Sequence, residues 1–169
     1  MKTATASVVL PCTPETFWKT YLDPQFAKDV YLGELGYKAL EILEATETTR
    51  RLRVTPKLSL PGPVEKILGD AFAYEDHGTL DRASGTWTWR MQPVTPPPGQ
   101  KPRSLPVTTR GTIRVVALGD GECRRTDELT IEAHVFGIGG LMESTAEKEA
   151  RGAWDKEFAF LRRRVASKP

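Results

Sequence analysis

The chain has 169 residues, of which 39% are hydrophobic and 27% charged, and its formal net charge is +2. These values are typical of a globular chain with one core, and they argue against a disordered chain or a nucleic-acid binder with concentrated basic charge. No run of about 18 apolar residues is present, so no membrane-spanning helix is expected. Cys12 and Cys123 are too few for a disulfide scaffold or a structural zinc site. Because a signal-peptide pattern is also lacking, the expected compartment is the reducing cytoplasm.

The N-terminal segment predicts one strand and two short helices. Thr, Ser and Val alternate over Thr3–Leu10, and this period of two indicates a strand. Thr13 and Pro14 form a typical N-cap and first helical residue. Asp23 and Pro24 begin the second short helix in the same way.

Six further strands follow from alternating or β-branched stretches. A segment rich in proline and glycine, Leu58–Pro63, separates the second and third of these strands and leads into one or two helical turns over Val64–Gly69. Pro93–Pro106 holds six of the thirteen prolines and predicts an exposed loop. The six predicted strands are Tyr37–Ala45, Thr46–Pro56, Ala71–Leu80, Gly85–Gln92, Thr108–Leu118 and Glu122–Val135.

The C-terminal segment Leu141–Ala166 predicts a long amphipathic helix of about 26 residues, roughly 39 Å in length. Acidic residues lie in its first half, and Arg162–Arg164 lie near its end, as the helix dipole favours. A contact of these arginines with phosphate or an anionic lipid is the alternative. The apolar stripe consists of Met142, Ala146, Ala150, Ala153, Trp154, Phe158, Leu161 and Val165.

The order of elements predicts an α+β helix-grip fold. Successive strands with short connections form an antiparallel sheet, and a curved seven-stranded sheet can wrap around the long C-terminal helix. Such an arrangement leaves an apolar space between sheet and helix. Residues 1–169 are expected to form a single domain, with 93–106 as a proline-rich loop and 166–169 as a tail.

Two segments resemble a known group of proteins. Leu60–Pro63 followed by Val64–Gly69, together with Val135–Glu143, are similar to segments of the START-like, or Bet v 1-like, superfamily. The similarity is strongest to bacterial proteins of the DUF2505 type and extends to PRELI-like and VASt-like lipid-transfer domains. The resemblance implies a cavity for a hydrophobic small molecule such as a lipid, sterol or polyketide. The proline-rich insert departs from the pattern of the group at the rim of that cavity.

Eleven residues are predicted to contact a ligand. Four of them come from the segment around Leu58–Pro63 and the following helical turns, and they form either a lid or ordinary core packing. The tryptophans either line a pocket or fill it, because each large aromatic side chain buries about 150–250 Å². The predicted ligand-binding residues are Trp87, Trp89, Met91, Leu58, Leu60, Ile67, Leu68, Phe136, Ile138, Met142 and Trp154.

Binding of a hydrophobic small molecule, with transport or sensing of it, is the preferred function. Transient contact with a membrane surface is compatible with this role, and no nucleic acid, metal or cofactor is expected. His77 and His134 lack metal-ligand spacing, and no catalytic motif is present. One alternative is a non-binding interaction module with a filled interior. The other is an enzyme of the polyketide cyclase or aromatase type, which would need polar groups inside the cavity, and its candidates are Tyr74, Asp76, Arg90, Glu132 and His134.

Overall fold

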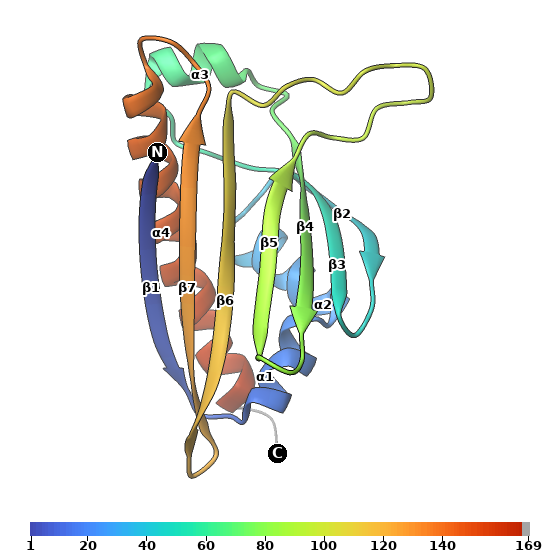
Figure 1. Ribbon diagram of the computed structural model, residues 1–169, viewed down its shortest axis with the longest axis vertical. Coiled ribbons are helices and arrows are strands. Elements are labelled where there is room, and N and C mark those ends of the chain that lie inside the picture. The colour runs from blue at the N-terminus through green and yellow to red at the C-terminus, as the bar shows by residue number, and fades with distance from the viewer. Residues whose placement is uncertain (167–169) are drawn as a thin grey trace.

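A seven-stranded antiparallel sheet curves around one long helix in the computed structural model, which describes residues 1–166 (Figure 1). The strand order is β1-β7-β6-β5-β4-β3-β2, so every strand after the first lies beside its neighbour in sequence. This confirms the predicted α+β helix-grip fold. The strands are β1 Lys2–Leu10, β2 Ala39–Ala45, β3 Thr49–Thr55, β4 Tyr74–Asp81, β5 Thr86–Gln92, β6 Val107–Gly119 and β7 Glu122–Ala133.

Two short helices follow β1 in the chain, and the N-caps of both form as expected. They are α1 (Pro14–Tyr21) and α2 (Pro24–Lys28). The Thr13 side chain accepts a hydrogen bond from Thr16 N at 3.2 Å, and Asp23 accepts one from Gln25 N at 2.9 Å. The chain then continues into a π-helical turn, η1 (Asp29–Glu34), which sequence periodicity did not distinguish from α2.

The long helix α4 spans Gly139–Ala166 and packs along β1 and β7. It begins two residues before the predicted start because Gly139 and Gly140 adopt helical geometry and β7 already ends at Ala133. Residues 167–169 of the predicted tail lie outside the described part of the chain. Near the end of α4, Arg163 pairs with Glu34 at 3.2 Å and Arg164 with Asp29 at 2.9 Å. These contacts tie the helix to η1.

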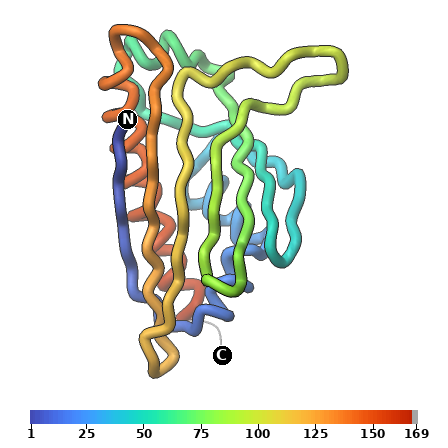
Figure 2. The backbone as a smooth tube through the Cα atoms, viewed as in Figure 1, coloured from blue at the N-terminus to red at the C-terminus, as the bar shows by residue number. Residues whose placement is uncertain are grey.

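The segment between β3 and β4 forms the predicted short helix α3 (Gly62–Leu68), which lies across one end of the sheet beside the start of α4 (Figure 1). The proline-rich stretch between β5 and β6 has no helix or strand, as expected. Figure 2 shows this stretch projecting sideways from the sheet. Among residues 1–166, no helix is both long and apolar enough to cross a membrane.

Two glycines of the sheet make room for the central tryptophans. A Cβ added to Gly78 on β4 would overlap the indole of Trp87, and one added to Gly111 on β6 would lie 3.0 Å from Cζ2 of Trp89. Each indole therefore lies flat against a neighbouring strand. Trp87 is buried in the lower core beside Tyr21, whereas Trp89 is only partly buried. Trp89 lines the pocket between sheet and helix, and Trp87 does not.

Candidate functional site

A pocket of about 210 Å³ lies between the inner face of the sheet and α4. The strands β4 to β7 supply its floor, and α4 supplies one wall. The chain around η1 and α3 supplies the remaining walls. We call this space the inner pocket.

Seven of the eleven predicted ligand-contacting residues line the inner pocket. The other four lie elsewhere. Trp87 is buried in the core, and Ile138 packs against the apolar cluster around Met142. Ile67 is 39% exposed and Phe136 fully exposed. The seven lining residues are Leu58, Leu60, Leu68, Trp89, Met91, Met142 and Trp154.

The end of the pocket near α3 is apolar. Val64 and Met142 are buried there, and Leu60 and Leu68 pack against them from the segment that precedes α3 and from its last turn. Leu129 adds an aliphatic side chain from β7. These side chains are all apolar, so the surface that they form suits an apolar group of a ligand.

The opposite end contains a buried ion network that joins the sheet to the helix. Arg125 on β7 is 1% exposed and donates two hydrogen bonds to Asp127, each 2.7 Å long. It donates a third, 3.0 Å long, to Glu157 on α4. Burial raises the pKa of Asp127, while the Arg125 guanidinium opposes that shift. All three nitrogens of Arg125 are thereby used by protein carboxylates.

A second buried guanidinium lies beside the first. Arg50 on β3 donates to the carbonyl oxygen and to the hydroxyl of Tyr21, both at 3.0 Å. Its Cζ atom also lies 4.4 Å from the centre of the Tyr21 ring. Burial raises the pKa of Tyr21 to about 12, so its hydroxyl stays protonated at neutral pH.

On the sheet side of the inner pocket, Asp76 is a carboxylate that has no direct partner. It projects from β4, and within residues 1–166 no hydrogen bond reaches its side chain. Burial raises its pKa to about 6, partly offset by the charges of Arg50 and His77. Desolvation also raises the pKa of Tyr31 and of Tyr74 well above the ordinary value, and the Asp76 charge adds to both shifts.

The structure places some of the five candidate residues of the enzyme hypothesis in the inner pocket and the others outside it. Tyr74 and Asp76 line the inner pocket. Arg90 lies on the outer face of the sheet, Glu132 pairs with Arg110 at 3.1 Å, and His134 contacts the Thr108 hydroxyl at 3.0 Å near the sheet surface. Part of the polar constellation that a cyclase needs is therefore present inside the fold.

Sequence reasoning missed Arg50, Arg125 and Asp127, although the signal was present. Arg125 and Asp127 share strand parity with the apolar residues Leu129 and Ile131, so period two alone places them on the inner face. Arg50 shares parity with the buried residues of β3 in the same way. A charge on the apolar parity of a strand was the pattern to look for.

The outer face of the sheet has a wider, open groove of about 630 Å³. Arg51, His77, Arg90 and Arg110 follow one another in register across β3 to β6. Protein carboxylates already contact several of these side chains. Arg51 and His77 both contact Glu75, and Arg110 contacts Glu132. We therefore assign the candidate site to the inner pocket.

The curved sheet and the long helix that it grips form the helix-grip fold, with the pocket between them. Residues 5–165 match the family model described as "Protein of unknown function (DUF2505)", and the chain belongs to that family. No curated protein matches the chain. In the part of the chain that the structure describes, no group of three or more His, Cys, Asp or Glu side chains is placed to hold a metal ion.

Several solved structures share the fold at low sequence identity. The TTHA0849 protein of Thermus thermophilus is 18% identical with a TM-score of 0.68, and the match covers 99% of this chain and 100% of that one. The Zhui aromatase/cyclase of Streptomyces sp. R1128 is 13% identical with a TM-score of 0.68, covering 97% and 95%. Norcoclaurine synthase of Thalictrum flavum, in complex with dopamine and hydroxybenzaldehyde, is 17% identical with a TM-score of 0.64, covering 99% and 88%.

Proposed function

We propose that the protein binds a compact, mainly apolar small molecule in the inner pocket. The observation that carries this proposal is that the pocket combines an aliphatic surface near α3 with a desolvated carboxyl group, Asp76, that has no direct partner among residues 1–166. Ligand sites commonly combine apolar walls with a few convergent polar groups in this way. Proteins of the same fold that bind small molecules support the proposal, among them one whose structure contains dopamine and hydroxybenzaldehyde.

The size of the inner pocket narrows the ligand. Its volume of about 210 Å³ is below the roughly 300–1,000 Å³ of common ligand sites. A molecule with one or two rings, or a short aliphatic chain, suits this space better than a sterol or a two-chain lipid. The hydrophobic ligand expected from the sequence is therefore narrowed to a small one.

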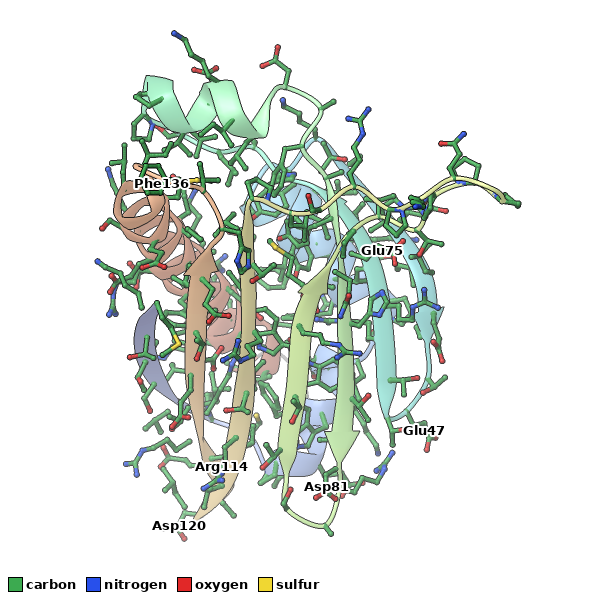
Figure 3. The ribbon with its side chains drawn as sticks, turned by 45° about the horizontal axis from the view of Figure 1, so that its top comes forward. Glu47, Glu75, Asp81, Arg114, Asp120 and Phe136 are labelled. Carbon is green, nitrogen blue, oxygen red and sulfur yellow. The ribbon has the colours of Figure 1, made fainter. Side chains whose placement is uncertain are left out.

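A route for entry is proposed at the α3 end. Leu60 and Leu68 line the pocket, and Ile67 is exposed on α3. Phe136, in the loop before α4, is exposed at this same end of the molecule (Figure 3). In this proposal α3 moves to admit the ligand, and the exposed pair Ile67 and Phe136 provides a transient contact with a membrane surface when the ligand is taken from one.

A cyclase-like activity is the second candidate, and Asp76 favours it. A carboxyl group with a pKa of about 6 can exchange a proton near neutral pH. Tyr31 and Tyr74 line the same pocket and keep their hydroxyl protons, so they can donate hydrogen bonds to a carbonyl oxygen of a substrate. In this alternative Asp76 is the acid–base group and the two tyrosines orient the substrate.

Filling the inner pocket tests the binding proposal. Ala150 on α4 lines the pocket, whereas Ala159 on the same helix is exposed. Ala150→Leu should abolish the binding of small apolar fragments detected by ligand-observed NMR, while its melting temperature stays equal or rises because leucine fills empty space. Ala159→Leu is the matched control and should bind as the wild type does. Unchanged binding by folded Ala150→Leu would refute the proposal, and Ala146→Val repeats the test with a smaller side chain.

A further inference from the structure

Two carboxylates face the inner pocket without a partner. Asp76 projects from the sheet and Glu149 from α4, so they enter from opposite sides. Neither side chain makes a hydrogen bond or ion pair with any residue from 1 to 166. Asp76 is desolvated, and the charges of Arg50 and His77 only partly offset that cost, while Glu149 is half-buried. Proteins retain a desolvated carboxylate without a direct partner mainly where it has a role.

The cations near this pocket are already bound to other groups. The guanidinium nitrogens of Arg125 donate hydrogen bonds to Asp127 and Glu157, and those of Arg50 donate hydrogen bonds to Tyr21. Even when Arg50 is counted beside Arg125, the carboxyl groups that line the pocket outnumber the guanidinium groups. The pocket therefore contains more acidic than basic side chains. The four lining carboxylates are those of Asp76, Asp127, Glu149 and Glu157.

Aromatic rings lie around the same two carboxylates. Tyr31 and Tyr37 have ring centres 5.6 Å apart, and Phe72 and Tyr74 have ring centres 5.9 Å apart. All four residues line the inner pocket. After desolvation, the charge of Glu149 has the largest influence on the raised pKa of Tyr37. Aromatic faces attract cations, and the combination of rings with carboxylates is typical of sites for organic ammonium groups.

We infer that the inner pocket selects an organic ammonium ion, with the cationic nitrogen between Asp76 and Glu149 and the apolar body toward α3. This inference rests on the proposed function and adds the charge of the ligand. An anionic ligand would add to the negative charge of the pocket. A neutral ligand would leave both carboxylates without a direct ionic partner. A protonated amine supplies the missing charge and stacks against the tyrosine rings.

An isosteric series of probes tests the charge directly. The dissociation constants of 2-phenylethylamine, 2-phenylethanol and 3-phenylpropanoate are measured at pH 7.5 by calorimetry or NMR titration. The amine should bind at least about tenfold more tightly than the alcohol, which corresponds to about 1.4 kcal/mol. The carboxylate should bind no more tightly than the alcohol. Equal binding of amine and alcohol overturns this inference and leaves the proposed function intact. Failure of all three probes to bind overturns both.

Removing one carboxylate at a time shows whether these two residues cause the preference. Asp76→Asn and Glu149→Gln should each weaken amine binding about tenfold and change alcohol binding less than about twofold. Asp155→Asn removes a charge from the exposed face of α4 and is the control, which should change neither. An unchanged amine preference in both variants refutes the assignment. Because Glu149 and Asp76 lie on different elements, each variant tests the assignment even where the other fails to fold.

Discussion

At the scale of single residues, Asp76 in the inner pocket is a carboxyl group whose charged form the folded state disfavours. Burial raises the pKa of Asp76 to about 6, and Arg50 on β3, His77 on β4 and Glu157 on α4 are the charged or titratable groups that act on it. A pKa raised on folding means that the folded state prefers the protonated acid. The contribution of the protonated Asp76 carboxyl to the free energy of unfolding is complete below about pH 4 and is lost as the pH rises through 6.

Asp76→Asn should therefore stabilise the protein at neutral pH. The expected gain in the free energy of unfolding at pH 7.5 is about 2 kcal/mol, because the neutral amide avoids the cost of a buried charge. The gain should decline between pH 6 and pH 4, where the wild-type acid is itself protonated. Urea unfolding of both proteins from pH 4 to pH 8 measures this. A variant that is less stable at pH 7.5 would contradict the account of an uncompensated carboxylate.

At the scale of elements, Glu75 on β4 connects the outer face of the sheet to the proline-rich loop. Its carboxylate is fully buried and contacts Arg51 and Arg53 on β3 at 3.5 and 3.3 Å. The backbone N–H of Thr95, at the start of the loop, donates to it at 2.8 Å. Figure 3 shows Glu75 beside β3 and β4. Desolvation favours the neutral acid, but the hydrogen bonds to the carboxylate, that of Thr95 foremost, together outweigh it and lower the pKa of Glu75 to about 2.

Glu75→Gln should destabilise the protein by about 2–4 kcal/mol at neutral pH, because two arginines lose their shared counter-charge. A lowered pKa means that the stabilisation is present above about pH 4 and is lost as the pH falls toward 2. The difference between variant and wild type should therefore shrink over that interval. Chemical unfolding at pH 7 and at pH 3 measures it, with Glu128→Gln on the outer face of β7 as the control. A constant difference would show that the charge of Glu75 is not the cause.

At the scale of the whole molecule, Arg125 holds the sheet and the helix together across the polar end of the inner pocket. It pairs with Asp127 on its own strand, β7, and with Glu157 on α4. Its guanidinium also lies 5.0 Å from the Phe158 ring centre, so it is packed as well as paired.

Arg125→Met should destabilise the fold by about 3–5 kcal/mol, because it leaves two carboxylates buried without a cation. The triple variant Arg125→Met, Asp127→Asn, Glu157→Gln should recover part of that loss, since no buried charge then remains unpaired. Thermal unfolding of the single and triple variants provides the comparison. If the triple variant is less stable than Arg125→Met alone, the three residues do not act as one network.

Local sequence patterns were sufficient to predict most secondary-structure elements of this protein. Period-two strands, the caps at Thr13 and Asp23, and the 3.6-residue period of the last helix each depend on neighbours in sequence, so all seven strands and the order of the helices could be predicted. The resemblance at Leu60–Pro63 and Val135–Glu143 led to the correct family. Trp89 and Met91 were placed toward the pocket because a strand alternates its faces.

Only the tertiary structure decided what the inner pocket contains. Asp76, Arg125 and Glu149 come from two strands and a helix that are distant in sequence, and whether each of them has a partner depends on distances that no local pattern specifies. The same three-dimensional packing buries Trp87 while leaving Trp89 at the pocket wall. The sequence determines which faces turn inward, because side-chain direction follows backbone periodicity. Whether an inward charge is paired or left for a ligand is set by the approach of elements that only folding brings together.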